Sequence, residues 1–350
     1  MAEDKQAIVV AVTALNAIDS PGPGVAVIRA IREGFSQPVR IIGLSYETLE
    51  PGIYLHDVVD KTYQIPYPSA GSDALMARLQ YINEKENIHV LIPNFDAELY
   101  NFIRLGPSLQ SIGIATFLPT QSQFEARDKI NLYQFGLKYG LSVPADRTIY
   151  NSNDLYGCAE FLGYPLVVKG KFYDAIVAYT LEQAQKAFYK LSSKWGLPII
   201  VQQFIAGTEI NIAVLGDGKG NAISIIPMKK LYITDKGKAW AGITLEDETL
   251  IELARTFVKA TNWKGGCELE IMRTATGVPY IMEINPRFPA WIYLSAAAGQ
   301  NQPASLVRMA MGEDVKPFTE YEVGKIFIRY SWDHITDVSE FQKISAFGEL

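Results

Sequence analysis

The first 120 residues alternate between apolar segments of strand length and segments with helical spacing, and this alternation is the strongest constraint on the fold. Residues 7–15, AIVVAVTAL, are apolar on both faces, as expected of a strand buried in a parallel sheet. A helical segment follows and ends at Gly34. The pattern continues with VRIIGLSY, a helix near 72–86, IHVLIPNF and a helix near 97–111. This order predicts an α/β fold whose N-terminal part is a doubly wound parallel sheet.

The segments after residue 120 predict two smaller lobes. A capping box of Ser122 and Glu125 predicts one long helix through FEARDKINLYQFGLKYGL. Two strands, a second boxed helix from Thr180 to about Trp195 and the strand LPIIVQQFI would form a small lobe. Two hairpins with a helix between them follow, and the C-terminal tail has no assignable element. The predicted domains are a Rossmann-like domain at 1–120, a linker helix with the small lobe at 121–205, and a large lobe at 206–350.

Composition and charge exclude several classes of protein. The net charge of −6 and the pI near 5.3 argue against a general nucleic-acid binder. No apolar run approaches the roughly 18–20 residues that a membrane span needs, and MAEDKQAIVV lacks the layout of a signal peptide. Cys158 and Cys267 lie outside any CxxC motif, so a reducing cytoplasm is the expected location. Neither a histidine metal site nor a hydrolase motif is present.

The hairpin at 267–287, CELEIMRTATGVPYIMEINPR, carries polar side chains on one face. If its turn centres on Thr276 and Gly277, Glu270 faces Glu283 and Glu268 faces Asn285. Directly opposed residues lie roughly 4.5–5.5 Å apart, where two carboxylates repel each other. The pair therefore needs a cation, a shared proton or water.

An oxygen-rich set of this kind suits a magnesium ion that also binds substrate phosphates. The predicted metal ligands are Glu270, Glu283 and Asn285, and Arg287 could bind a phosphoryl or carboxylate group through its planar fork. The alternative is a solvent-exposed strand face with hydrated charges, and a hairpin register shifted by one residue would scatter the set.

Lysines at two places are candidates for binding phosphate. Lys129 lies on the first boxed helix, Lys169 follows four apolar residues at a strand end, and Lys171 comes two residues later. Solvent exposure explains each of them equally well.

The segment VQQFIAGTEIN is more specific. Where an apolar strand ends, free backbone amide and carbonyl groups can bind the edge of an adenine, and the carboxylate of Glu209 can accept ribose hydroxyls. The adenine-binding candidates are Gln202, Gln203, Phe204 and Ile205. A strand that simply ends in a glycine turn is the alternative.

The segment DSPGPGVAV imitates a dinucleotide-binding fingerprint through Gly22 and Gly24. The third position is Val27, where close packing requires Gly or Ala, and Pro23 removes a backbone donor. An NAD-dependent oxidoreductase is therefore disfavoured. The loop still follows the first strand at the sheet edge where such folds bind ligands, so Asp19, Ser20, Gly22 and Gly24 are candidates for substrate binding.

Taken in order, these motifs resemble those of the ATP-grasp ligases. Lys129, Lys169, VQQFI with Glu209, Glu270 and Glu283-Ile-Asn-Pro-Arg287 follow the ATP-binding region of that superfamily, and the resemblance covers roughly residues 1–315. MEINPRFPAWIYLSAAAGQ is most similar to free-standing, single-unit relatives of the carbamoyl-phosphate synthetase large chain. The spacing of Glu270 and Glu283 also resembles D-alanine–D-alanine ligase.

The resemblance implies a pre-ATP-grasp domain followed by the two α+β lobes of an ATP-grasp fold. It implies that Lys129 and Lys169 contact ATP phosphates, that Gln202 to Ile205 contact adenine and Glu209 the ribose. It further implies that Glu270, Glu283 and Asn285 bind Mg²⁺, or Mn²⁺ in its place, and that Arg287 stabilises the transferred phosphoryl group or the acyl phosphate. The implied reaction is ADP-forming ligation of a carboxylate and an amine through an acyl phosphate.

One stretch departs from the family pattern. After Lys169 the family usually has a glycine- and serine-rich phosphate loop, whereas here KGKFYDAIVAYT contains only Gly170 and then bulky residues. Lys171 could take over part of the phosphate binding. An ATP-binding protein without turnover is therefore one alternative, and an enzyme that forms carboxyphosphate, as in carbamoyl-phosphate synthetase or biotin carboxylase, is another.

The expected substrates are an amino acid or peptide carboxylate and an amine nucleophile, with no nucleic-acid or membrane partner and with a homodimer left open. Asp96 and Glu98 end a strand and would suit a cationic amine, although helix capping explains them equally well. Lys229 and Lys230 are further catalytic candidates that could reach the phosphates, with a solvated charge run as the alternative.

Overall fold

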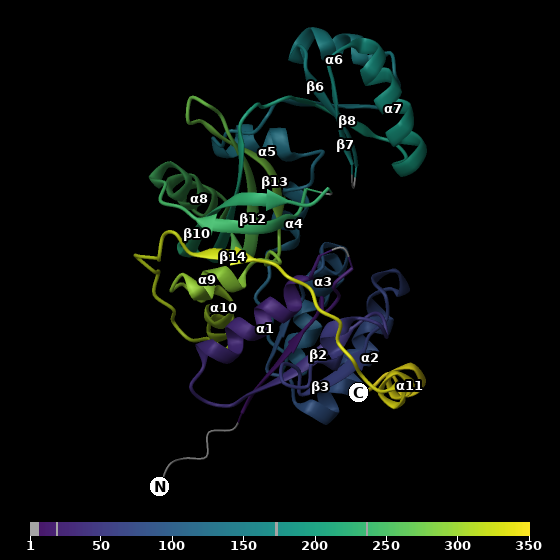
Figure 1. The fold of residues 1–350 in the computed structure, drawn as a ribbon, viewed down its shortest axis with the longest axis vertical. Helices are drawn as coiled ribbons and strands as arrows, with labels where there is room; N and C mark the ends of the chain where they lie inside the picture. Colours follow the sequence, from purple (N-terminus) through teal and green to yellow (C-terminus); the bar gives the residue numbers. More distant parts are fainter. Residues whose placement is uncertain (1–6, 19, 172–173, 236) are drawn as a thin grey trace. The chain divides into compact units, whose positions relative to one another are not determined.

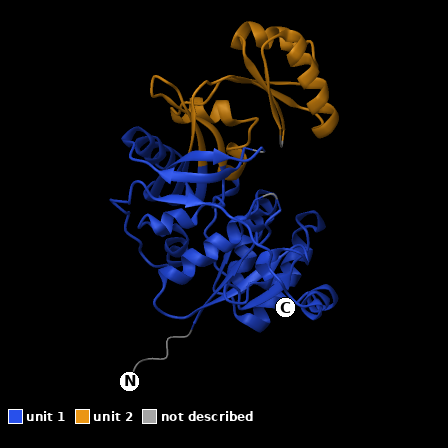
Figure 2. Cartoon of the chain, in the orientation of Figure 1, with its two compact units in different colours: residues 1–121, 211–268, 285–350 blue, residues 122–210, 269–284 orange. Residues whose placement is uncertain are grey.

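The computed structural model describes residues 7–18, 20–171, 174–235 and 237–350 (Figure 1). The chain divides into two compact units (Figure 2). Unit 1 comprises residues 1–121, 211–268 and 285–350, and unit 2 comprises residues 122–210 and 269–284. Within the described residues, no helix combines the length and apolar character needed to cross a bilayer.

Unit 1 begins with the predicted parallel sheet. Its strands lie in the order β3-β2-β1-β4, and every neighbouring pair is parallel. The sequence analysis did not identify the short, partly polar edge strand β3. The bounds are β1 (Ile8–Val12), β2 (Val39–Ser45), β3 (Lys61–Gln64) and β4 (Val90–Ile92), with two 3-10 turns at Pro51–Tyr54 and Pro68–Ala70.

Helices cover both faces of this sheet. Alternate residues of β1 point to opposite sides: Val10 packs in one apolar cluster and Val9 in another. The first cluster takes up α1 (Pro23–Gly34), and the second takes up α2 (Ser72–Glu86) and α3 (Asp96–Ser111). The doubly wound prediction is therefore confirmed, and it explains why β1 is apolar on both faces.

A six-stranded sheet forms the other major layer, in the order β13-β12-β9-β10-β11-β14, and β11 pairs antiparallel with both β10 and β14. Asp247 caps α8 by accepting hydrogen bonds from the N–H groups of Thr249 and Leu250, which confirms the predicted helix near 247–262. The bounds are β9 (Thr208–Asp217), β10 (Ala222–Ile233), β11 (Ala239–Thr244), α8 (Glu248–Thr261), β12 (Lys264–Arg273), β13 (Pro279–Asn285), α9 (Tyr293–Ala297), α10 (Gln302–Ala310) and β14 (Ile326–Ile328).

The C-terminal tail returns to the N-terminal sheet. After β14, the helix α11 (Val338–Phe347) leads to the last residues, and Leu350 exchanges two backbone hydrogen bonds with Thr62 on the edge strand β3, of 2.8 and 3.0 Å. Arg78 on α2 donates to the carbonyl of Gly348 over 2.9 Å, and Figure 1 shows α11 beside α2. The tail thus covers an edge that would otherwise expose unpaired backbone groups.

Unit 2 contains a four-stranded antiparallel sheet in the order β5-β8-β6-β7. Thr180 caps α7 by accepting a 3.3 Å hydrogen bond from the N–H of Gln183, which confirms the second predicted helix start. The side chain of Gln183 accepts from the N–H of Tyr179 and not from that of Thr180. The helices α6 and α7 pack on one face of the sheet in a common apolar core. The bounds are β5 (Asp146–Ile149), α6 (Asp154–Leu162), β6 (Leu166–Gly170), β7 (Ala175–Ala178), α7 (Leu181–Trp195) and β8 (Ile199–Gln203).

The prediction of one long helix after Ser122 was wrong. The segment forms two short helices, α4 (Gln121–Ala126) and α5 (Leu132–Tyr139), and Ser122 lies inside the first of them. Between them the side-chain amide of Asn131 donates to the carbonyl of Glu125 over 3.1 Å, and the N–H of Asn131 donates to the carbonyl of Asp128 over 2.7 Å. Short polar side chains of this kind compete with helical hydrogen bonding. Lys129 therefore lies in the break, not on a helix.

We expect Ile344→Ala to lower the free energy of unfolding by about 2–5 kcal/mol, because Ile344 is completely buried in the core of unit 1 and truncation leaves a cavity. Denaturant unfolding measures the change. Phe347→Ala on the same helix is the matched control, because Phe347 is 74% exposed. Equal effects of the two substitutions would show that α11 does not pack as described.

Candidate functional site

Charged residues far apart in sequence come together in unit 2. Lys129 Nζ lies 3.3 Å from Glu283 Oε1. Lys169, near the end of β6, has its pKa lowered by burial and by the neighbouring charge of Lys129, while Glu283, Glu270 and Asp146 act in the opposite direction. The structure thus brings together four of the residues predicted from the sequence, and it adds Asp146, which the sequence analysis missed.

The strand end predicted to bind adenine lies beside this cluster. The N–H of Gln203 donates to the carbonyl of Ala145 over 2.8 Å, and the chain then leaves the sheet through half-buried Phe204 and buried Ile205. A Cβ atom at Gly207 would lie 2.2 Å from the carbonyl oxygen of Arg273, so only glycine allows the chain to pass there. Glu209 follows as an exposed residue on β9.

Lys171 lies near the same region. Its charge lowers the pKa of Asp128, against the larger effect of burial, which raises that pKa. Phe172 and Tyr173, the bulky residues that replace the expected glycine-rich loop, lie outside the described residues.

A second polar cluster, in unit 1, centres on Glu268. This carboxylate is 5% exposed and accepts hydrogen bonds from four side chains. The donors are Asn211 Nδ2 at 2.6 Å, Trp291 Nε1 at 2.8 Å, Asn285 Nδ2 at 3.2 Å and Arg287 Nη1 at 3.3 Å. The contact between Glu268 and Asn285 agrees with the predicted hairpin, whose turn the N–H of Gly277 closes by donating to the carbonyl of Thr274 over 2.9 Å.

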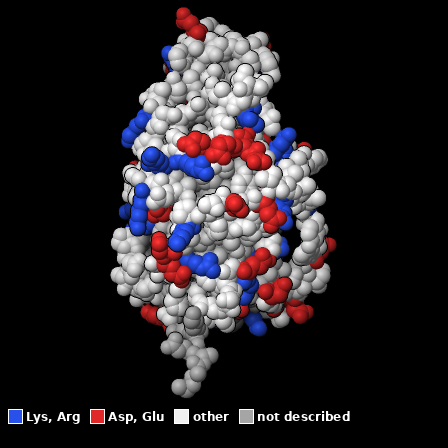
Figure 3. Space-filling model, turned by 90° about the vertical axis from the view of Figure 1, so that its left-hand side faces the viewer, with Lys and Arg blue, Asp and Glu red and all other residues white. Residues whose placement is uncertain are grey.

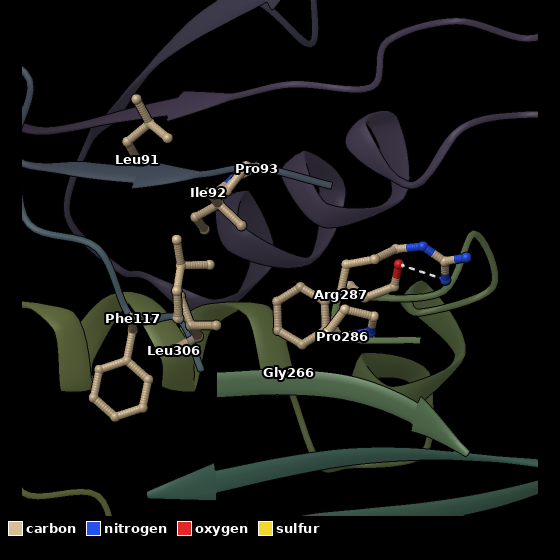
Figure 4. Close-up of a pocket in the computed structure, with 10 residues that line it drawn as sticks. Leu91, Ile92, Pro93, Phe117, Gly266, Pro286, Arg287 and Leu306 are labelled. Carbon is tan, nitrogen blue, oxygen red and sulfur yellow. Dashed lines mark hydrogen bonds between the residues drawn. The ribbon is translucent and has the colours of Figure 1, made fainter. Parts of the chain in front are cut away.

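Arg287 joins two carboxylates. Its Nε atom lies 3.1 Å from Asp96 Oδ2, and its Nη1 atom contacts Glu268. Figure 4 shows Arg287 beside a small pocket whose other walls are mainly apolar. The structure therefore brings the predicted anion-binding arginine to the start of α3, where Asp96 was predicted as a substrate residue.

The loop after β1 supplies one further contact. Ser20 is buried, and its hydroxyl oxygen accepts a hydrogen bond from Arg329 Nη1. Burial lowers the pKa of Arg329, and the negative charge of Glu268 opposes that effect. Sequence reasoning missed Arg329 because it lies in the unassigned tail; the signal was one arginine within the apolar and aromatic run KIFIRYSW. The predicted Asp19 lies outside the described residues.

Gly22 and Gly24 do not form a phosphate-binding loop. The N–H of Gly22 donates to the carbonyl of Asn16 over 2.7 Å, and that of Gly24 to the carbonyl of Ala14 over 3.0 Å. A Cβ atom at either position would come within 2.6 Å of the Ala14 carbonyl oxygen. These glycines allow a close turn between β1 and α1, and their amides donate inside the loop. Their role in substrate binding stays a prediction.

Glu98, predicted from the sequence as a substrate residue, has a structural role at the start of α3. It is fully buried and accepts hydrogen bonds from the N–H groups of Asn94 and Phe95, over 2.8 and 2.9 Å, and from the hydroxyls of Thr13 and Tyr46. These contacts cap the N-terminus of α3. Burial raises the pKa of Glu98 to about 7, while the hydrogen bonds act to lower it.

Lys229 and Lys230 are adjacent on β10, so their side chains point to opposite faces of the strand. Lys229 is exposed, and Lys230 Nζ donates to the carbonyl of Gly237 over 3.3 Å. The predicted catalytic role of these two lysines stays a prediction. On the face of the molecule in Figure 3, positive and negative side chains are interspersed.

The donor set in unit 2 fits a phosphate-bound magnesium ion better than an ion held by protein alone. In the part of the chain that the structure describes, no three or more His, Cys, Asp or Glu side chains are grouped to hold a metal. Mg²⁺ typically binds one or two carboxylates and completes its shell with phosphate oxygens and water. Glu270 and Glu283, both acting on Lys169, match that pattern.

Comparison with known proteins identifies the fold. Residues 197–328 match the family described as ATP-grasp in the biosynthetic pathway with Ter operon. The D-alanine–D-alanine ligase of Xanthomonas axonopodis pv. citri (strain 306) is 28% identical over 173 residues, which are 45% of this chain and 54% of that protein. The chain thus spans about half the length of the curated relatives it matches.

Solved structures agree over most of the chain. The biotin carboxylase domain of Hydrogenobacter thermophilus 2-oxoglutarate carboxylase, in complex with MgADP, ADP and bicarbonate, has a TM-score of 0.71 at 17% identity and covers 92% of this chain and 74% of that chain. The L-amino acid ligase from Bacillus licheniformis has a TM-score of 0.65 at 18% identity and covers 89% of this chain and 78% of that chain. The chain has an ATP-grasp fold, as the sequence motifs implied.

We expect Glu98→Gln to change how stability depends on pH. The folded-state pKa of about 7 lies above the ordinary value of 4.5, so the folded state holds an extra proton between these pH values. The contribution of Glu98 to stability is therefore present at low pH and falls as pH rises toward 7. Urea unfolding between pH 5 and 8 should show the variant gaining stability relative to the wild type up to about pH 7. A difference independent of pH would contradict the assignment.

Proposed function

We propose that this protein is an ATP- and Mg²⁺-dependent ligase that joins a carboxylate to an amine and releases ADP and phosphate. The observation that carries the proposal is the convergence, within unit 2, of Lys129 and Lys169 with Glu270 and Glu283. Burial and the neighbouring charge of Lys129 lower the pKa of Lys169. The triphosphate of ATP with its metal ion would give this cluster an anionic ligand. The ATP-grasp fold supports this reading of the cluster.

Within this proposal, each group has a separate task. Lys129, Lys169 and Lys171 would bind the phosphates, and Glu209 would accept ribose hydroxyls. Bound Mg²⁺ would offset the charge that develops on the transferred phosphoryl group. Its ligands would be Glu270, Glu283 and Asn285, and the adenine would lie against Gln202, Gln203, Phe204 and Ile205.

In unit 1, Arg287 would bind the anion that reacts. Its guanidinium is held by Glu268 and Asp96, so it is oriented before substrate arrives and little reorganisation is needed on binding. A carboxylate or acyl phosphate would bind to the planar guanidinium of Arg287. Asp96 would bind a cationic amino group, as expected for an amino acid or peptide substrate.

The similar proteins support this substrate class. They include D-alanine–D-alanine ligases and an L-amino acid ligase. The biotin carboxylase neighbours make bicarbonate the other acid to test. The domain division at 1–120, 121–205 and 206–350, a homodimeric assembly and a cytoplasmic location remain predictions.

The test measures ADP and phosphate release from Mg·ATP with a panel of amino acids, short peptides and bicarbonate. We expect release that depends on a specific pair of substrates. Glu283→Ala should reduce turnover by about 10²-fold or more, because a metal ligand supplies several kcal/mol of transition-state stabilisation. Glu160→Ala is the control, since Glu160 is exposed on α6. Turnover that Glu283→Ala leaves unchanged would remove the metal site.

Lys169→Ala should weaken binding of Mg·ATP by about 10–100-fold, because it removes a charge-assisted hydrogen bond to phosphate. Isothermal titration calorimetry measures the affinity, with exposed Lys190→Ala on α7 as the matched control. Equal affinities for the two variants would exclude a phosphate contact by Lys169. If the wild-type protein binds ATP but no substrate pair gives ADP release, the protein is a nucleotide-binding protein without ligase turnover.

A further inference from the structure

The sheet of unit 2 has a polar face that α6 and α7 do not cover. Asp146 on β5 is the direct antiparallel partner of Gln202 on β8, and Gln202 is in turn the partner of Val167 on β6. Direct partners, and residues two apart on one strand, share a face of the sheet. Asp146, Gln202 and Lys169 therefore project from the same face.

The opposite face is the one that packs on the helices. Val168 and Val201, which alternate with Val167 and Gln202, belong to the apolar core that includes residues of α6 and α7. Gln202 on the polar face is only 2% exposed, and Asp146 and Lys169 are half-buried. A largely buried sheet face thus carries a carboxamide, a carboxylate and an ammonium group.

Two acceptor oxygens on this face lack donors. Gln202 Oε1 and Asp146 Oδ2 are buried, and neither has a hydrogen-bond partner among the described residues. An unpaired buried acceptor is costly, so an apo protein that keeps two of them at paired positions requires an explanation. Burial raises the pKa of Asp146 to about 6, opposed by the charge of Lys169, so Asp146 is mainly an acceptor at neutral pH.

An exocyclic amino group matches this pair, because it offers two N–H donors from one nitrogen atom. Adenine has such a group at its 6-position, whereas hypoxanthine has a carbonyl oxygen there, which would face two acceptors. We propose that Asp146 and Gln202 together read the 6-amino group of the purine, and that Asp146 makes the site select ATP over a 6-keto nucleotide. The inference rests on the proposed function, in which unit 2 binds ATP.

The experiment measures the affinities of wild-type protein and Asp146→Asn for Mg·ATP and Mg·ITP by isothermal titration calorimetry. The wild type should prefer ATP. Asparagine can turn its NH₂ group toward a 6-keto oxygen. The ratio of the ATP affinity to the ITP affinity should therefore be about tenfold lower in the variant than in the wild type, because ATP binds more weakly while ITP binds equally or more strongly. Glu160→Gln, the same change of charge at an exposed position of unit 2, should leave the preference intact.

A thermal unfolding measurement without nucleotide provides an independent readout. Because Asp146 Oδ2 is buried without a donor among the described residues, Asp146→Asn should be at least as stable as the wild type. Should this variant not fold, Gln202→Met, which keeps the side-chain length but removes the acceptor, tests the same preference.

The outcomes separate the inference from the proposed function. A wild type that binds ATP, with an ATP-to-ITP ratio that neither Asp146→Asn nor Gln202→Met changes, overturns the inference and leaves the function standing. Equal weakening of ATP and ITP does the same, because it indicates general damage to the site. A folded wild type that binds neither nucleotide overturns both.

Discussion

A buried carboxylate organises the polar interior of unit 1. Removing the charge of Glu268 from water is tolerable only if hydrogen-bond donors surround it. Four side chains donate to it: Asn211 from β9, Asn285 from β13, and Arg287 and Trp291 from the segment that follows. The run Glu-Ile-Asn-Pro-Arg is therefore held in position by a carboxylate from the neighbouring strand β12. Arg287 in turn holds Asp96, which connects this arrangement to the start of α3.

Unit 2 shows the opposite condition. Lys129 and Lys169 repel each other, and Gln202 and Asp146 carry buried acceptor oxygens without donors among the described residues. Such groups reduce the stability of the free protein, and binding of a ligand with matching charge and donors would recover that cost. The donors around Glu268 thus satisfy that carboxylate within unit 1, while the cluster in unit 2 presents polar groups that a nucleotide would complete.

The sequence predicted secondary structure best where residues close together in the chain cause that structure. Alternating apolar segments predicted the doubly wound sheet, because residues on both faces of β1 are buried. Thr180 and Gln183 predicted a helix start, because capping involves only neighbouring residues. The same logic failed at Ser122, because the helix breaks where the side-chain amide of Asn131 donates to the carbonyl of Glu125. Local pattern also did not reveal that Glu98 caps α3 and that Gly24 allows a close turn after β1.

Sequence by itself determined the alternation of strands and helices in the N-terminal sheet and a set of candidate residues for binding ATP and Mg²⁺, since residue type and spacing express local propensity and chemistry. Only the tertiary structure decided which of those groups meet. It paired Asp146 with Gln202 across two strands, brought Arg329 to Ser20, and closed the edge of β3 with Leu350. These contacts join residues distant along the chain, and their partners are set by sheet register and burial, which no local pattern specifies.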